Sequence, residues 1–308
     1  MPINPAIFSE RPLVFCFGPA EPPQSRPEIS SDTLHFLETE PFFREALEAC
    51  DAHVLRRQGW SVLETLKRPE LLSPSDSGVW ACSTVCLQLA LAHALKGQGY
   101  VPDAVLCVSS GELAAAFLYG GLQLLEATDI ALAVAGLFCQ GAQTLWCSGP
   151  AEQVQKVVRP DLEFYVAAEY GQMGFAVSVR DDGAEQVRQA FTTAGIGSRK
   201  IFARFGGHSP LIDHHHEEFR SGLVPLRLDA AWPYYSSHAG GRIRSQDSVE
   251  YLWNVVRYLA RVDAAVDAVL RDGFRNFVTV WPSVPLEFLL KLQAHQLGTS
   301  VQVHSGIQ

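Results

Sequence analysis

The chain has 308 residues, of which 47% are hydrophobic and 19% are charged, and its formal net charge is −9. This composition excludes a disordered polypeptide and predicts a globular protein with one large domain and an insertion, or with two domains. The acidic balance argues against nucleic acid as a partner. We expect no membrane-spanning run and no signal peptide. Seven cysteines without a CxxC pair, with Cys82 and Cys86 in an apolar helix, indicate buried thiols in a cytoplasmic protein.

The first half of the chain predicts apolar strands that alternate with helices. Residues 13–17 and 104–108 are continuous apolar runs, which is typical of strands buried on both faces of a parallel sheet. A proline-rich loop at 18–27 follows the first run. Helices are expected at residues 41–58, 79–95, 112–118 and 122–138. This alternation predicts a parallel α/β sheet.

A different order of elements begins near residue 144. Strands are expected at 144–147, 164–168, 175–180 and 200–203, and helices at 152–158 and 183–194. The resulting β-α-β-β-α-β order predicts a ferredoxin-like unit inserted into the α/β body. The body then resumes with a strand at 233–237, a long helix at 248–270 and a final strand at 277–281.

Ser109 lies at the corner between a strand and a helix. The sequence Ala-Val-Leu-Cys-Val-Ser-Ser-Gly-Glu at 104–112 predicts a nucleophile elbow, in which the serine Oγ is exposed on a tight turn. The amide of Ser110 would then point at a developing oxyanion. A serine hydroxyl is a poor nucleophile at neutral pH, so a base must lie within hydrogen-bond reach.

His208 is the best candidate for that base. It lies in the sequence Phe-Gly-Gly-His-Ser-Pro at 205–210, directly after the last strand of the inserted unit. Glycines at 206 and 207 allow the backbone to approach a substrate closely. Taken alone this motif is a weak signal, because a lone histidine is more often structural than catalytic.

The serine and the histidine together resemble the malonyl-CoA:acyl-carrier-protein transacylase family, which includes the acyltransferase domains of polyketide synthases. Residues 107–112 occupy the position of the family's GHSxGE elbow, and His208-Ser209-Pro210 occupies that of its general base. The similarity is colinear from about residue 13 to about residue 290. It implies an α/β-hydrolase-like large subdomain at 1–128 and 199–308, with a ferredoxin-like small subdomain at 129–198.

The resemblance implies a ping-pong acyl transfer. Ser109 attacks a thioester while His208 takes its proton, and the acyl group then passes to the phosphopantetheine thiol of an acyl carrier protein. Ser110 would supply one oxyanion amide, and an amide near Ala20, in the loop after the first strand, would supply the second. No cofactor is implied beyond the phosphopantetheine, of the carrier or of coenzyme A, that carries the substrate.

Departures from the family's pattern concern the acyl group. Malonyl-loading members hold the substrate carboxylate with an arginine 25 residues after the serine, where this chain has Val134. They also narrow the pocket with a phenylalanine where this chain has Gly207, preceded by Gly206. Tyr170 replaces an asparagine of the small subdomain and is either a pocket residue or a packed aromatic. These departures predict a non-malonyl acyl group, such as a starter, aminoacyl or dipeptidyl unit.

Other functions remain open from the sequence. The same residues would serve an editing hydrolase, in which water replaces the carrier thiol, and the altered elbow would also fit a catalytically degenerate carrier-binding module. No metal site is expected, since the consecutive histidines at 214–216 point in different directions on a helix. An acidic carrier would need a basic patch, for which the candidates are Arg199, Lys200, Arg204, Arg242 and Arg244.

Overall fold

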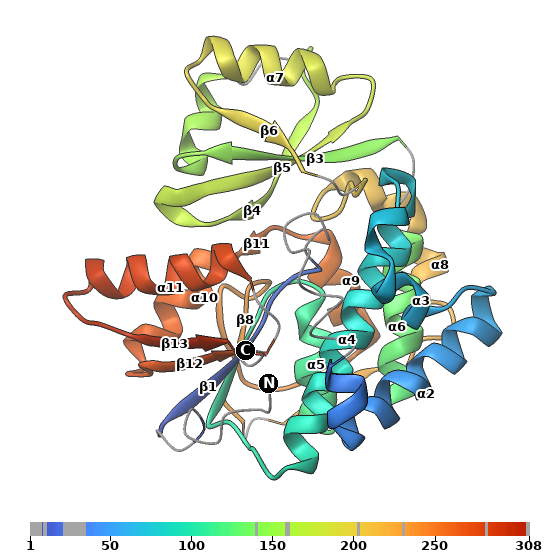
Figure 1. Ribbon diagram of the computed structural model, residues 1–308. Helices are drawn as coiled ribbons and strands as arrows, with labels where there is room; N and C mark the ends of the chain where they lie inside the picture. Colours follow the sequence, from blue (N-terminus) through green and yellow to red (C-terminus); the bar gives the residue numbers. More distant parts are fainter. Residues whose placement is uncertain are drawn as a thin grey trace.

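The computed structural model describes residues 8, 11–20, 35–138, 141–157, 161–201, 204–229, 232–280 and 283–305. Figure 1 shows a large subdomain built around one sheet and a smaller α/β unit stacked above it. From residue 21 onward, the expected proline-rich loop lies outside the described residues, as do residues 202–203 of one expected strand. The predicted division into a large body and a small inserted unit is confirmed.

The large subdomain is organised by a six-stranded sheet in the order β13-β12-β1-β2-β8-β9, parallel except for β9. Both central strands are completely buried, as their apolar runs predict. Leu13, Phe15 and Phe17 pack into one apolar cluster, while Val14 and Cys16 pack into another. This alternation places helices over both faces of the sheet. The strands are β1 (Leu13–Phe17), β2 (Ala104–Cys107), β8 (Tyr234–Ser236), β9 (Gly241–Ile243), β12 (Asn276–Thr279) and β13 (Gln302–Ser305).

Helices cover the two faces unequally. In Figure 1 a larger group lies to one side of the sheet and a smaller group to the other. The larger group consists of α2 (Pro41–Gln58), α3 (Val62–Lys67), α4 (Ser77–Gly97), α5 (Gly111–Leu118), α6 (Leu124–Gly136), α8 (His216–Arg220) and α9 (Val249–Arg257). The smaller group consists of α10 (Val262–Arg271) and α11 (Val284–Gln296).

Helix α4 is the centre of the larger group. With 21 residues and a mean hydropathy of 1.5 it is long and apolar enough to cross a membrane, contrary to the expectation that no run reaches that length. However, 89% of its most apolar window is buried inside the fold, where α2, α5 and α6 pack against it. It is therefore a core helix, and no second helix of this kind occurs in the described part of the chain. Cys82 and Cys86 are buried free thiols, as predicted.

The small subdomain has the predicted ferredoxin-like topology. Its antiparallel strands lie in the order β4-β5-β3-β6, and β11 extends the sheet by pairing parallel to β4. The helix expected at 152–158 is a short 3₁₀ helix, Ala151–Lys156, and the strand expected at 200–203 begins earlier. The elements are β3 (Ala142–Ser148), β4 (Phe164–Glu169), β5 (Gly174–Arg180), α7 (Ala184–Thr193), β6 (Ser198–Lys200) and β11 (Ala260–Arg261).

Both predicted subdomain boundaries fall inside elements. The boundary between 128 and 129 cuts α6, whose buried apolar residues belong to the core of the large subdomain. The boundary between 198 and 199 cuts β6. The small sheet begins at Ala142, so α6 is part of the large subdomain. The buried residues of α6 lie on both sides of residue 128, so the helix continues through the predicted boundary.

The long helix expected at 248–270 is two helices. The chain leaves α9 at Tyr258, forms β11 and re-enters a helix as α10. Neither glycine nor proline marks this break, so the apolar pattern reads as continuous. The strand at 277–281 is not the last one, because β13 follows it. Also unpredicted are the two-stranded pair β7 (Leu226–Leu228) and β10 (Gln246–Ser248) and the helices α3 and α11. The helix start expected at the histidines 214–216 is the 3₁₀ helix Pro210–His215, which α8 continues.

Candidate active site

Ser109 occupies a tight strand-to-helix turn, as the elbow prediction requires. Its backbone φ is +52°, in the left-handed region that non-glycine residues rarely adopt. A glycine is needed two residues later, at position 111, because a Cβ there would lie 2.4 Å from the carbonyl oxygen of Phe17. The Ser109 amide donates to Oγ of Ser237 over 3.3 Å. The strained turn presents the serine side chain at the carboxyl end of the central strands.

His208 meets Ser109 across the fold. Its Nε2 lies 3.0 Å from the Ser109 Oγ, although 99 positions separate the two residues in the chain. On the other side of the ring, Nδ1 lies 2.8 Å from the carbonyl oxygen of Tyr258. Because a carbonyl only accepts, Nδ1 carries the ring hydrogen and the Nε2 lone pair faces the serine hydroxyl. A main-chain carbonyl thus accepts the hydrogen bond that an acidic side chain accepts in a Ser-His-Asp triad.

The imidazole of His208 is held in its neutral form. The pKa of His208 is lowered to about 4, chiefly by burial and to a smaller extent by nearby His238, while the hydrogen bond to Tyr258 opposes the shift. A neutral imidazole can accept a proton at neutral pH. The backbone φ of His208 is +54°, so the base is as strained as the serine it faces.

Ala20 and Ser110 lie together beside the serine. The Ala20 amide donates to the Ser110 Oγ over 3.0 Å, and both residues line the same cavity as Ser109. The loop before Ala20 is held by Gln88 of α4, whose Nε2 donates to the Gly18 carbonyl over 3.1 Å. The two predicted oxyanion amides therefore come from neighbouring segments, and the hydroxyl of Ser110 covers one of them.

A cavity of about 770 Å³ opens at the serine and the histidine, between the two subdomains. Val134 lines it from α6 and is 5% exposed, so an apolar side chain stands at this wall. Tyr170 lines it from the small subdomain, where its ring packs edge-on against Trp146 with centroids 5.2 Å apart. The cavity is therefore largely apolar, with exposed Phe288 at its edge.

Of the two glycines before the base, Gly207 lines the cavity, but a neighbouring ring occupies the space that its missing side chain leaves. The ring of Phe205 fills the space beside Gly207, where an added Cβ would lie 1.7 Å from its Cζ. That ring stacks on Phe138 with centroids 4.3 Å apart, so an aromatic wall remains and comes from position 205. Gly206 does not line the cavity but packs against Ala142. Sequence position alone could not show which side chain fills the gap.

The predicted docking arginines have different surroundings. Arg199 and Lys200 on β6 are exposed and line the cavity, and β3–β6 pairing sets Arg199 opposite Trp146. Arg242, on β9, and Arg244, just after it, are exposed at the edge of the large sheet, where β9 pairs with β8. Arg204 is half-buried, with its amide bonded to the Ser77 Oγ, so it is a poor candidate for carrier docking. Of the histidines at 214–216, the last two are half-buried and lie near Glu218 and Glu250.

Glu112, three residues after the serine, is a buried acid to which the sequence analysis gave no role. Its side chain is 1% exposed, accepts a hydrogen bond from Tyr251 over 2.5 Å and accepts another from Ser236. Burial raises the pKa of Glu112 to about 7, and these hydrogen bonds oppose the shift. Oγ of Ser236 also accepts the His238 amide over 3.1 Å. A single acid within the apolar α5 was the signal for this network.

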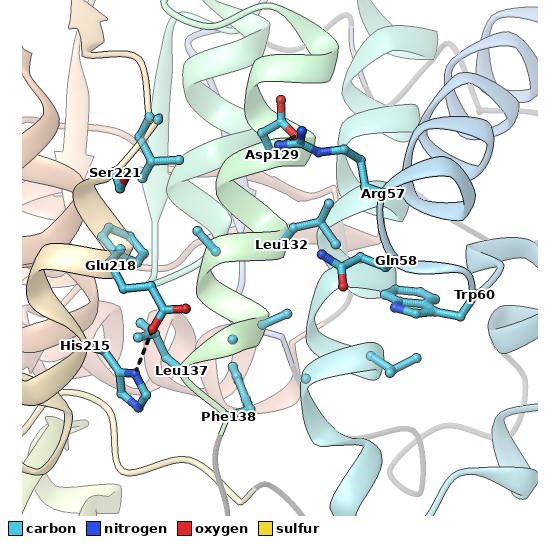
Figure 2. A pocket seen from close by; sticks show the side chains of 18 of the residues that line it. Arg57, Gln58, Trp60, Asp129, Leu132, Leu137, Phe138, His215, Glu218 and Ser221 are labelled. Carbon is cyan, nitrogen blue, oxygen red and sulfur yellow. Dashed lines mark ion pairs between the residues drawn. The ribbon is translucent and has the colours of Figure 1, made fainter.

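A second cavity, of about 750 Å³, contains none of the predicted site residues (Figure 2). Arg57 and Asp129, 3.3 Å apart, lie on one side, and His215 with Glu218 lies on another. Phe138 borders this cavity as well as the one at Ser109. The stacked Phe138 and Phe205 rings therefore stand between the two spaces.

The sequence profile of the acyl transferase domain family matches residues 33–288, which is most of the chain. The chain belongs to this family. This acyltransferase domain is 26% identical over 279 residues to a mycocerosic acid synthase-like polyketide synthase of Mycobacterium tuberculosis, covering 88% of the chain and 13% of that relative. Among eight such curated relatives, it spans between 5% and 14% of the relative's length.

Solved structures give the same family and fold. A loading acyltransferase from the avermectin modular polyketide synthase is similar with a TM-score of 0.80 and 26% identity, over 96% of this chain and 94% of that one. The malonyl CoA-acyl carrier protein transacylase of Clostridium perfringens shares the fold, with a TM-score of 0.76 and 14% identity, over 95% and 92% of the two chains. The predicted fold class and the predicted family are thus confirmed.

Proposed function

We propose that this chain transfers a non-malonyl acyl group from a thioester donor to an acyl carrier protein, through an ester on Ser109, in the biosynthesis of a polyketide-type product. The observation that carries the proposal is the Ser109–His208 contact of 3.0 Å, with Nδ1 of the base on a carbonyl and the serine facing an apolar cavity. We also propose a cytoplasmic location, because the substrates would be carried by coenzyme A or carrier proteins.

The proposed reaction has two halves that use the same base. In the first, the Ser109 Oγ attacks the thioester carbonyl carbon while its hydrogen passes to Nε2 of His208. The oxyanion is received by the amide of Ser110 and, once the Ser110 hydroxyl turns away from it, by the amide of Ala20. Collapse breaks the carbon–sulfur bond, and the leaving thiolate takes the proton from His208. In the second, the carrier's phosphopantetheine thiol gives its proton to His208 and attacks the ester carbonyl. Collapse breaks the bond between this carbon and the Ser109 Oγ, which takes the proton back from His208.

The shape and polarity of the cavity support a non-malonyl acyl group. A malonyl carboxylate beside Val134 would meet an apolar wall, at a cost of roughly several kcal/mol if left unpaired. The hydroxyls of Thr144 and Ser178, which also line the cavity, already donate to the carbonyls of Phe205 and Gly207, each over 2.7 Å. Their hydrogens are therefore not available to a substrate carboxylate. The avermectin relative is named as a loading acyltransferase, which also favours a starter-type acyl group.

The proposed partner is an acidic carrier protein that approaches the cavity mouth. Exposed Arg199 and Lys200 stand there, on the small subdomain. Arg242 and Arg244 add positive charge on the large subdomain, and no ion pair engages any of these four among the described residues. Opposite charge would steer a carrier toward the serine despite the net charge of −9. No cofactor is proposed beyond the phosphopantetheine arm that brings the acyl group.

The test is intact-mass analysis of the chain after incubation with a panel of acyl thioesters. The panel contains malonyl, acetyl, branched, aromatic, aminoacyl and dipeptidyl donors, and the matched control is Ser109→Ala. We expect an adduct with at least one non-malonyl donor, none with malonyl, and none on the control. Added carrier protein should then remove the adduct and gain its mass.

Each other outcome points to a different function. A malonyl adduct would overturn the substrate argument, and its loss in Arg199→Ala would show that β6 supplies the anion partner. An adduct that decays to free acid despite the carrier thiol would indicate the editing hydrolase. No adduct with any donor, together with carrier binding, would indicate the degenerate carrier-binding module.

A further inference from the structure

The base His208 is held by the end of helix α9. Its amide donates to the carbonyl of Val256 over 2.7 Å, and Nδ1 donates to the carbonyl of Tyr258 over 2.8 Å. Both acceptors therefore lie within three residues of one another, where the chain leaves the helix. Because a main-chain carbonyl, and not an acidic side chain, accepts the Nδ1 hydrogen, the ring position depends on where this short segment lies.

An ion pair joins the same two segments. Asp213, five residues after the base, lies in the 3₁₀ helix Pro210–His215, and Arg257 is the last residue of α9. Nη2 of Arg257 donates to Oδ2 of Asp213 over 3.0 Å, and its Nε donates to Oδ1. Arg257 is thus the residue between the two carbonyls that hold His208. Its side chain is only 15% exposed.

The Tyr258 backbone is also held by its own amide, which donates to the Asn254 carbonyl over 3.0 Å, and by β11, which pairs with β4 from Ala260 onward. Its side chain adds less. The Tyr258 side chain is 51% exposed, so packing restrains it weakly. Its ring is flanked by the Arg257 guanidinium, 5.1 Å from the centroid, and by the His238 ring at 6.3 Å. The guanidinium that bonds Asp213 therefore also borders the residue whose carbonyl orients the base.

We infer that the Asp213–Arg257 ion pair is a positioning element for the base, which keeps the Tyr258 carbonyl at Nδ1 of His208. The inference rests on the proposed role of His208. An exposed ion pair contributes little by itself. This one is bidentate and its arginine is largely buried, which fixes direction as well as distance. Its loss would let the imidazole turn away from Ser109 without removing any group that touches substrate.

The experiment measures how fast Ser109 reacts with a fluorophosphonate probe, which needs neither the natural acyl group nor a carrier. The serine oxygen bonds to phosphorus, fluoride leaves, and His208 takes the proton. The variants are Asp213→Asn, Arg257→Gln and the double variant. Asp213→Glu keeps the carboxylate, and Asp267→Asn is the matched control because it removes an exposed ion pair with Arg271 on α10.

We expect the maximal inactivation rate to fall about 10- to 100-fold in both single variants, with the half-saturating probe concentration unchanged. The double variant should be no slower than the slower single variant, because one interaction is lost in all three. Asp213→Glu should recover most of the rate, and Asp267→Asn should match the unchanged chain. Thermal unfolding of each variant separates loss of fold from loss of reactivity.

Unchanged rates in folded Asp213→Asn or Arg257→Gln would overturn the inference, as would additive losses in the double variant. If a single variant fails to fold, two other variants replace it: Asp213→Glu, and the charge-exchanged double variant Asp213→Arg with Arg257→Asp. If neither of these labels faster than His208→Ala, the inference is equally overturned. A wild-type chain that does not label at all would instead overturn the proposed function of Ser109 and His208.

Discussion

Gly207→Ala tests whether the Phe205 ring is the wall of the acyl cavity. The added Cβ would lie 1.7 Å from Cζ and 2.0 Å from Cε1 of Phe205, whereas real Cβ contacts stay beyond 3.0 Å. The ring edge must therefore retreat by at least 1.3 Å. Since Phe138 stacks on the ring at 4.3 Å, the movement either breaks that stacking or pushes the ring into the cavity.

The expected cost follows from these two effects. Overpacking of this kind destabilises a protein by about 1–3 kcal/mol, and lost stacking adds about 0.5–1.5 kcal/mol. We expect the midpoint of thermal unfolding to fall by several degrees. We also expect kcat/KM for a bulky phenylacetyl thioester to fall about ten-fold relative to acetyl, which corresponds to about 1.4 kcal/mol of transition-state binding.

Gly136→Ala is the control, because nothing lies within 4 Å of its added Cβ and it sits at the end of α6. It should leave stability unchanged or slightly higher. If Gly207→Ala were as stable as the unchanged chain and kept the same preference among acyl sizes, Phe205 would not be the wall. The sequence argument that Gly207 opens the pocket would then be correct.

Four further predictions concern charge. Val134→Arg should form a malonyl adduct, detected by mass, and should lose adducts of uncharged acyl groups, because the variant places a guanidinium in the apolar wall. A folded variant that forms no malonyl adduct would contradict this. With the pKa of His208 lowered to about 4, acylation should be level from about pH 5 to 8 and fall as the base protonates below that range; a midpoint near 6.5 would mean that the imidazole is not desolvated. Burial raises the pKa of Glu112 to about 7, so stability should decline as pH rises from 5 to 8, and Glu112→Gln should flatten that decline in thermal melts; equal slopes would refute it. Arg242→Glu or Arg244→Glu should slow transfer from a carrier protein and spare a small thioester; equal loss with both donors would remove the docking role.

The elbow and its base could be predicted because each has a local signature. A buried strand, a serine and a glycine at fixed spacing describe the turn around Ser109, and glycines precede His208. Their contact across the fold was predicted only through the family resemblance. No periodicity or spacing states that residues 99 positions apart lie within 3.0 Å.

The break at Tyr258 shows why other features could not be predicted. Residues 248–270 have a continuous amphipathic pattern, and the chain leaves the helix without a glycine or proline. The carbonyl freed at this break accepts the hydrogen bond from His208, and β11 pairs with β4 directly afterwards. These are contacts with distant segments, whose free energy overrides a local helical preference.

The sequence by itself determined the layered α/β body, the ferredoxin-like insertion, the position of the serine turn and the apolar residue at 134. These follow from side-chain periodicity and turn chemistry, which act over a few residues. Only the tertiary structure decided that a carbonyl orients the base, that Phe205 fills the space beside Gly207, that Gly206 lies outside the cavity and that Arg204 is half-buried. Those outcomes depend on which distant segments pack together, because burial and hydrogen-bond partners are properties of the assembled core.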